Sequence, residues 1–413
     1  MAISPLAPDH FPALPAIRGV RITSAASGMK YQGRDDMMAM LIDPGSYVAG
    51  VFTTSDTAAP AVIWSRDHCH QNGDQNIRAI ITNAGNANAF TGQQGAEDVQ
   101  MLCTDFAHYL DGQNINAENI LIASTGVIGE PLDCACLRSH FATLASAPDA
   151  GWENGAAAIL TTDTFAKGAS ATAQIDGIEV TICGIAKGSG MIAPNMATML
   201  GYVATDAAIG PAALKQILTN ASNRSFNAIT VDSDTSTSDS VFLVATGKAG
   251  NAEINDADDP RLDGFCAALD QVMQDLAKQI VRDGEGAEKL ITIDVAGAAD
   301  DARAHKIGMS IANSPLVKTA IAGGDANWGR VVMAVGKAGA NIDQRELSIA
   351  VGGVTIAQNG ARLDGYDETP VAKHMTGSDI NIAVTVGSGT GTARVWTCDL
   401  THGYITINAD YRS

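Results

Sequence analysis

The sequence predicts an α+β fold in which most strands pair antiparallel. Apolar stretches with strand alternation and stretches with helical spacing follow each other along the chain. Short turn motifs join neighbouring strands more often than helical crossovers do, which favours hairpins over a parallel sheet. The composition is globular, because 46% of the 413 residues are hydrophobic and 17% are charged. This length suffices for two or more cores or for one large intertwined core.

Turn motifs place several strands in the first half of the chain. Strands Met37–Ile42 and Tyr47–Thr53 are joined at Asp43-Pro44-Gly45, where proline presets φ and glycine supplies a left-handed position. Residues Ala171–Ile185 alternate around Asp176-Gly177, a strong hairpin turn pair. Between them we expect, in order, strand Arg78–Thr82, helix Ala96–Leu110, strand Ile120–Ser124, and helices Leu132–Ala145 and Asn154–Leu160.

The second half is predicted to be richer in strands. A strand follows the glycine-rich segment near residue 198, then a helix from about Ala212 and the polar run Asp232–Ser240. A long amphipathic helix is expected at Pro260–Val281. The remaining expected elements are strand Leu290–Val295, a helix opening within Asn327–Val335, and strands in Leu347–Ile356, Ile380–Val386, Ala393–Asp399 and Tyr404–Asn408.

Charge and cysteine content exclude several classes of function. The net charge of −19 repels phosphate groups, so we expect no binding to nucleic acid or to anionic membranes. Seven scattered cysteines without a CxxC pair predict neither a disulfide framework nor a zinc site. No apolar stretch reaches the length of a membrane span, and the first residues do not resemble a signal peptide. The expected location is the cytoplasm.

The segment Lys187–Leu200, KGSGMIAPNMATML, carries the strongest indication of chemistry. Its glycines and Pro194-Asn195 allow sharp turns, and it places Thr198 before an apolar stretch. A threonine hydroxyl is a poor nucleophile unless a base lies beside it, and its own α-amino group can be that base once the preceding peptide bond is cut. We therefore predict self-cleavage between Ala197 and Thr198, with Thr198 as the nucleophile. The products would be an α fragment, 1–197, and a β fragment, 198–413, forming one intertwined unit.

This segment resembles the autocleavage motif of the ornithine acetyltransferase family (glutamate N-acetyltransferase, ArgJ). Five further motifs match in family order, so the resemblance covers essentially the whole chain. They are Ser124–Gly129, Thr161–Thr164, Asp283–Ala287, Gly324–Arg330 and Ile407–Ser413.

The resemblance implies roles for individual residues. Thr125 and Gly126 resemble the pair that stabilises the oxyanion of acyl transfer. Thr164 and Lys187 resemble substrate contacts, although Thr161 or Thr162 could be the true threonine contact. Glu285 resembles the residue that receives the side-chain amino group of the substrate, with Glu288 as its rival. Asn408 and Ser413 match contacts made by the end of the chain, and Thr198 itself would contact substrate.

The resemblance also implies a reaction, a layered fold and an assembly. Thr198 would take the acetyl group of N-acetylornithine and pass it to glutamate in a ping-pong mechanism. No metal or organic cofactor is expected, and the use of acetyl-CoA as a second donor stays open. The family fold is a layered αββα arrangement that resembles N-terminal nucleophile hydrolases, with two copies of each fragment in a heterotetramer. The alternatives are a related self-processing aminopeptidase and an unprocessed small-molecule binding protein.

Two other motifs are tempting but weak. His68-Cys69-His70 places two histidines on one face of a predicted strand, yet no further metal ligands cluster nearby, so a solvated turn is the better interpretation. Gly387-Ser388-Gly389-Thr390-Gly391 resembles a phosphate-binding loop, but no lysine follows it, and hairpin turns use the same residues.

Overall fold

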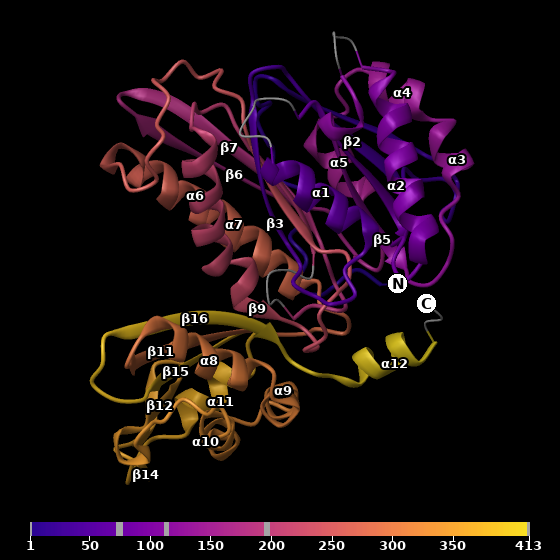
Figure 1. Cartoon of the computed structure of the whole chain (residues 1–413). Helices are drawn as coiled ribbons and strands as arrows, with labels where there is room; N and C mark the ends of the chain where they lie inside the picture. The colour runs from indigo at the N-terminus through magenta and orange to yellow at the C-terminus, as the bar shows by residue number, and fades with distance from the viewer. Residues whose placement is uncertain (1, 72–76, 111–114, 194–198, 411–413) are drawn as a thin grey trace.

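The computed structural model describes residues 2–71, 77–110, 115–193 and 199–410. It has two lobes, an upper one of two stacked sheets and a lower one built on a third sheet (Figure 1). Most strand pairs are antiparallel, as predicted; β4–β5, β8–β10, β11–β15 and β9–β16 are parallel.

The first sheet of the upper lobe has the order β1-β2-β4-β5. Its strands are β1 (Val20–Ala25), β2 (Met37–Ile42), β4 (Ala79–Asn86) and β5 (Ile120–Val127). Helices α2 (Gly92–Ala107), α3 (Cys134–Arg138) and α4 (Phe141–Ser146) share a buried core with one face of this sheet. That core includes Ile81 and Ile122 from the strands and Phe106 and Phe141 from the helices.

The second sheet has the order β3-β10-β8-β7-β6. Its strands are β3 (Tyr47–Phe52), β10 (Ser240–Ala245), β8 (Leu200–Thr205), β7 (Ile178–Lys187) and β6 (Lys167–Ile175), and α6 (Pro211–Asn223) and α7 (Asp263–Arg282) cover its outer face. Its inner face packs on the first sheet, because Met38 and Met40 share a core with Tyr202 and Phe242. Helices α1 (Pro60–Gln71) and α5 (Gly151–Ala158) contact strands of both sheets. The layers run helix, sheet, sheet, helix, which confirms the predicted αββα arrangement.

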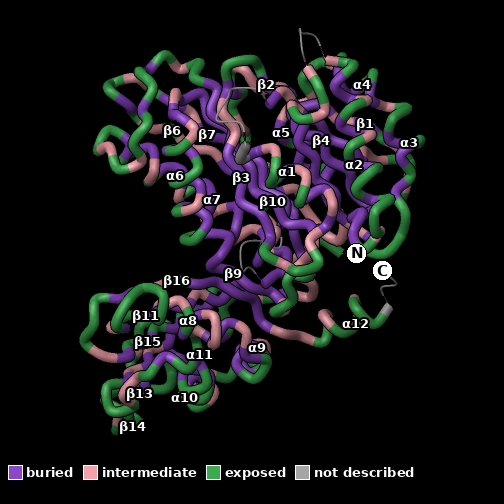
Figure 2. Tube along the Cα trace, in the orientation of Figure 1, coloured by how far each residue is buried: buried purple, intermediate pink, exposed green. Residues whose placement is uncertain are grey.

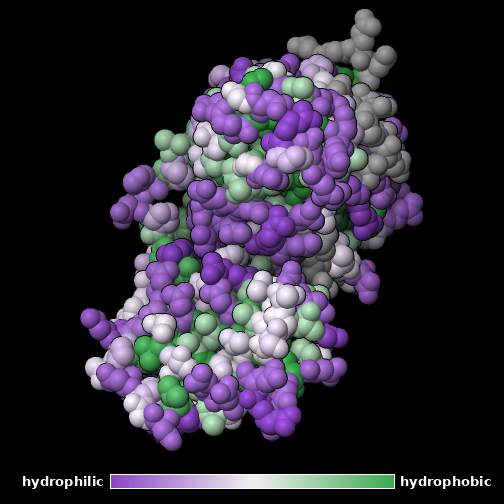
Figure 3. Space-filling model, turned by 90° about the vertical axis from the view of Figure 1, so that its left-hand side faces the viewer, coloured by the Kyte–Doolittle hydropathy of each residue, from purple (hydrophilic) through white to green (hydrophobic). Residues whose placement is uncertain are grey.

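The lower lobe is a seven-stranded sheet in the order β14-β13-β12-β15-β11-β16-β9. Its strands are β9 (Ile229–Thr230), β11 (Leu290–Ala298), β12 (Ser348–Val351), β13 (Val354–Gln358), β14 (Ala361–Arg362), β15 (Asp379–Thr385) and β16 (Gly391–Cys398). Its helices are α8 (Asp301–Ala312), α9 (Pro315–Ala322), α10 (Trp328–Gly336) and α11 (Thr369–Met375). Buried residues follow the strands of both lobes (Figure 2). The face shown in Figure 3 is largely hydrophilic over the upper lobe, and hydrophobic residues are scattered over the lower one.

Several sequence predictions need correction. The predicted strands Met37–Ile42 and Tyr47–Thr53 exist, but they enter different sheets and do not pair with each other. Tyr404–Asn408 belongs to the helix α12 (His402–Asp410), not to a strand. His68 and Cys69 lie in α1, where the His68 ring stacks on Trp64. The helix predicted over Leu132–Ala145 is two short helices, α3 and α4.

The strand after the predicted cleavage point occupies the middle of a sheet. β8 runs parallel to β10 on one side and antiparallel to β7 on the other. β7 and β3 lie before residue 198 in sequence, whereas β8 and β10 lie after it. The two predicted fragments would therefore share one sheet. The division at residue 198 itself stays a prediction.

Candidate functional site

The structure describes six of the predicted site residues: Thr125, Gly126, Thr164, Lys187, Glu285 and Asn408. Ala197, Thr198 and Ser413 lie outside the described residues. Hydrogen bonds and ion pairs bring the six into two groups, one around Lys187 and one around Glu285. The Glu285 group lies where the end of α7, the segment after β7 and the terminal helix α12 line one cavity.

The predicted oxyanion pair lies at the end of β5. Gly126 has a φ of +133°, and a Cβ there would come within 2.2 Å of the Gly85 backbone on β4. Only glycine fits, because side-chain-bearing residues avoid this backbone region and the neighbouring strand is too close. Thr125 is buried, and its Oγ1 accepts a hydrogen bond of 3.2 Å from Lys187 Nζ. Gly126 therefore gives the end of β5 a backbone conformation that other residues avoid, and Thr125 places one hydroxyl beside it.

Lys187 is the buried cation of this group. It ends β7, is 8% exposed, and its Nζ lies 4.0 Å from Asp163 Oδ2. Burial lowers the pKa of Lys187 because the charged ammonium loses its hydration, although the negative charges of Asp163 and Asp239 oppose this shift. The lysine therefore stays buried because carboxylates compensate its charge.

A second buried lysine joins the group to the end of α7. Lys167 Nζ lies 2.7 Å from Asp163 Oδ1 and 2.6 Å from Asp283 Oδ2, and all three side chains are fully buried. Burial acts to raise the pKa of Asp163, but the two lysines hold it below its usual range. Gly188 N–H donates to Asp163 at 2.6 Å, and Ser189 Oγ donates to the Asp283 carbonyl at 2.6 Å. This cluster fixes the start of the glycine-rich segment.

Sequence reasoning missed Asp163, Lys167 and Asp283 as site residues. Asp163 and Asp283 lie within the matched motifs Thr161–Thr164 and Asp283–Ala287, so these motifs could have indicated them as site residues. Lys167 stands in no matched motif. An aspartate four residues before a lysine is too common to single it out.

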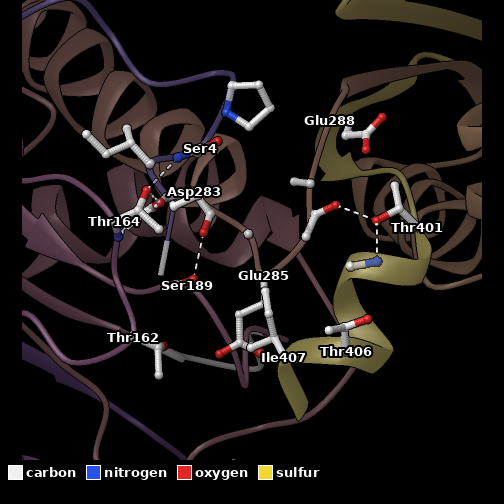
Figure 4. A pocket seen from close by; sticks show the side chains of 17 residues that line it. Ser4, Thr162, Thr164, Ser189, Asp283, Glu285, Glu288, Thr401, Thr406 and Ile407 are labelled. Atoms are coloured by element: carbon white, nitrogen blue, oxygen red, sulfur yellow. Dashed lines mark hydrogen bonds between the residues drawn. The ribbon is translucent and has the colours of Figure 1, made fainter. Parts of the chain in front are cut away.

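The predicted substrate contact Thr164 has its hydroxyl engaged within the protein. Its Oγ1 donates to Asp283 Oδ1 and accepts the Ser4 N–H at 2.9 Å. Thr162 also lines the cavity (Figure 4). Both Thr164 and Thr162 line this cavity, so the structure does not choose between them as the substrate contact. Thr164 in addition helps to hold Asp283 in place.

Glu285 and Asn408 meet at a cavity of about 460 Å³. Asn408 Nδ2 donates to Glu285 Oε2 at 2.7 Å, so α12 folds back over the segment after α7. Burial raises the pKa of Glu285, and the hydrogen bonds from Asn408 and Thr162 oppose the shift. The rival Glu288 also lines the cavity but is exposed. The half-buried carboxylate of Glu285 suits a ligand ammonium better than the exposed carboxylate of Glu288, because the attraction between opposite charges is stronger away from water.

The glycine-rich segment presses directly against Glu285. A Cβ at Gly190 would lie 2.5 Å from the Glu285 carboxylate carbon, so any side chain there would push this carboxylate out of its position. Over the described part of the chain, no group of three or more histidine, cysteine, aspartate or glutamate side chains could hold a metal ion. None of the helices found there is both long and apolar enough to cross a membrane.

Comparison with known proteins covers the whole chain. The ArgJ family model matches residues 21–413. The arginine biosynthesis bifunctional protein ArgJ of Rhizobium meliloti (strain 1021) is 51% identical over 100% of this chain and 99% of its own length. The protein of the same name from Agrobacterium fabrum is 50% identical over 100% of both chains.

A solved structure agrees with these sequence matches. The arginine biosynthesis bifunctional protein ArgJ from Bacillus halodurans is similar with a TM-score of 0.50 and 42% identity, over 52% of this chain and 100% of that one. The family match and the full-length relatives show that the chain belongs to the ArgJ family of arginine biosynthesis enzymes.

Proposed function

We propose that this enzyme moves the acetyl group of N-acetylornithine to glutamate through an acetyl ester on Thr198. The Thr198 hydroxyl attacks the acetyl carbonyl, and the freed α-amino group of the same residue accepts the hydroxyl proton. Ornithine leaves with a proton on its α-amine. The amine of glutamate then attacks the ester, N-acetylglutamate leaves, and the threonine hydroxyl regains its proton.

The hydrogen bond between Lys187 and Thr125 carries this proposal. It joins the residue that ends β7, eleven positions before Thr198, to the hydroxyl that would stabilise the oxyanion. The oxygen of a tetrahedral intermediate at this point would meet the Thr125 hydroxyl and the Gly126 N–H, with the Lys187 charge beside them. Preorganised donors in a buried site act more strongly than donors in water.

The cavity at Glu285 supports the choice of donor. Ornithine carries an ammonium on its side chain, and a half-buried carboxylate held by Asn408 is a suitable partner for it. The cluster formed by Lys167, Asp163 and Asp283 is internally paired, so it leaves Glu285 as the acceptor for a ligand cation in this cavity. Ser413 would act from the same terminal segment.

Self-cleavage has support from a relative as well as from the sequence. Residues Thr198–Ser413 make up 52% of this chain, and the solved Bacillus halodurans chain matches the same share of it over its full length. We propose a cytoplasmic enzyme of two α and two β fragments that needs no cofactor. The name bifunctional in the relatives supports a second activity, acetylation of glutamate by acetyl-CoA.

Mass spectrometry of active enzyme, combined with the variant Thr198→Ala, tests the proposal. Wild-type protein should give two fragments, the second beginning TMLGY, and should form N-acetylglutamate only with an acetyl donor. Thr198→Ala should remain one chain without activity. The matched control is Thr205→Ala, which removes the same hydroxyl group at the far end of β8 and should still be cleaved.

Three outcomes would count against the proposal. A full-length active enzyme would refute it, and so would two fragments from Thr198→Ala. Release of free acetate without N-acetylglutamate would favour the aminopeptidase-like alternative.

A further inference from the structure

The polar segment Thr230–Ser240 contacts the chain on both sides of residues 194–198. On the upstream side, Asp232 Oδ2 accepts the Met191 N–H at 2.6 Å and Asp232 Oδ1 accepts the Ile192 N–H at 2.8 Å. Thr230 Oγ1 and Thr235 Oγ1 donate to the carbonyls of Ile192 and Ala193, both at 2.9 Å. The last described residues before 194 are thus bound through N–H and C=O groups together.

The same segment binds the first residue after 198. Ser240 N–H donates to the Met199 carbonyl at 3.1 Å. Burial raises the pKa of Asp239, and a hydrogen bond from the Met199 backbone opposes that shift. Met199 and Asp239 are each 3% exposed. A single stretch of chain therefore sets where residues 193 and 199 lie.

The upstream contact holds a strained backbone. Met191 has a φ of +57°, in the left-handed region that a residue with a side chain rarely adopts. Its side chain is 42% exposed, so packing does little to impose this conformation. The two hydrogen bonds to Asp232 start at Met191 and the next residue, and they are charge-assisted, which makes them the stronger kind.

The lower lobe holds the polar segment in turn. Lys318 on α9 is buried, and its Nζ donates to the Val231 carbonyl and to Thr397 Oγ1, both at 2.8 Å. Ile229 and Thr230 pair with β16. The polar segment that carries Asp232 is therefore held by the lower lobe, whereas Thr125 belongs to the upper lobe.

We propose that the polar segment Thr230–Ser240 is the template for self-cleavage and that Asp232 is its principal positioning residue. Asp232 holds Met191 and Ile192 in the turned conformation on the upstream side of the predicted cleavage point. This inference rests on the proposed self-cleavage, and it assigns Asp232 no part in acetyl transfer.

The variant Asp232→Asn tests the inference, with Asp234→Asn as its matched control. The asparagine NH₂ cannot accept an N–H, so one of the two bonds to the turn is lost. Asp234 is exposed, and its substitution makes the same change of charge two residues away. In a time course of cleavage after synthesis, we expect Asp232→Asn to form the second fragment at least about tenfold more slowly than wild type, and Asp234→Asn to match wild type.

The outcomes separate this inference from the proposed function. If wild type forms no fragments, the proposed self-cleavage fails and this inference fails with it. If wild type is cleaved and Asp232→Asn keeps pace with it, only the inference fails. Unfolding temperatures are compared in the uncleaved Thr198→Ala background. A large drop caused by Asp232→Asn, or slow cleavage of both asparagine variants, would mean general destabilisation and would overturn the positioning role.

Discussion

The two lobes differ in how they keep a buried lysine. In the upper lobe, Lys167 lies between two carboxylates, Asp163 and Asp283, and all three side chains are fully buried. In the lower lobe, Lys318 donates to the Val231 carbonyl and to the Thr397 hydroxyl. Lys167 is thus neutralised by carboxylates within the site. Lys318 is instead held by a carbonyl and a hydroxyl, and its bond to Val231 joins the lower lobe to the polar segment. The comparison teaches that the upper-lobe lysine belongs to a charged cluster of the site, whereas the lower-lobe lysine fixes the polar segment that contacts the glycine-rich segment.

Removing the charge of Lys167 should have the largest effect on stability. Lys167→Met leaves Asp163 and Asp283 buried without their shared cation, which typically costs about 3–5 kcal/mol. Urea denaturation measures this loss in the free energy of unfolding. Arg394→Met in the lower lobe is the control, because its pair with Asp294 is more than one-third exposed on both sides and such pairs contribute about 1 kcal/mol or less. Equal losses in the two variants would contradict the comparison.

Removing the hydroxyl of Thr125 should have the largest effect on the reaction. Thr125→Ala is expected to lower kcat by about 10²–10³ because one donor to the oxyanion is lost. Lys187 also loses a buried acceptor in this variant, so some loss of stability is expected, and kcat is compared at a temperature where the variant is fully folded. Thr125→Ser keeps the hydroxyl and should retain most of the activity. If the alanine variant transfers acetyl groups as fast as the serine variant, Thr125 does not hold the oxyanion.

The lower-lobe lysine gives a smaller effect. Lys318→Met leaves the Val231 carbonyl and the Thr397 hydroxyl without this donor, and an unsatisfied buried group costs about 1–3 kcal/mol. Thermal unfolding should show a loss smaller than that of Lys167→Met. Lys306→Met is the control, because Lys306 is exposed and its Nζ donates to the Gly339 carbonyl at the surface. A loss as large as that of Lys167→Met would remove the distinction between the lobes.

The smallest effect concerns the pH dependence at Glu285. Its pKa is raised by burial, and the hydrogen bond from Asn408 opposes that shift because it stabilises the ionised carboxylate. Asn408→Ala should therefore raise the pKa further and move the acid limb of kcat/KM to higher pH, since only ionised Glu285 attracts the ornithine ammonium.

A pH profile with acetylornithine as donor measures this shift. Thr406→Ala on the same helix is the control, because its hydroxyl donates to the His402 carbonyl. Its acid limb should coincide with that of wild type. An acid limb that persists unchanged in Glu285→Gln would show that another group titrates.

Turns and periodicities are local, so they allowed an α+β class with mostly antiparallel strands to be predicted, whereas the layered αββα arrangement was expected from the family resemblance. The sequence could not show that β2 and β3 part into different sheets, since a Pro-Gly turn is compatible with a hairpin or with a corner between layers. It also suggested a strand at Tyr404–Asn408, where Ile405 and Ile407 alternate with Thr406. The segment forms a helix because it leaves the sheet after Cys398, so its backbone groups must pair within the segment.

The candidate site was predictable where a motif carried it. Four described residues were expected from the motifs, and the structure joins them in two hydrogen-bonded pairs: Lys187 with Thr125, and Asn408 with Glu285. The ion pairs of Lys167 could not be foreseen, because Asp283 is distant in sequence and only the packing of α7 on β6 brings it close. Long-range charge pairs follow from the assembled fold and leave little trace in local spacing.

The central place of β8 has a consequence for the proposed mature enzyme. Strands from before and after residue 198 are interleaved in one sheet, so neither piece can leave without exposing the backbone edges of the other. Heating should melt both pieces in one cooperative transition, and dilution alone should not dissociate them. Severing one peptide bond would thus supply a reactive terminus close in sequence to a central strand, while the two pieces remain one folded body.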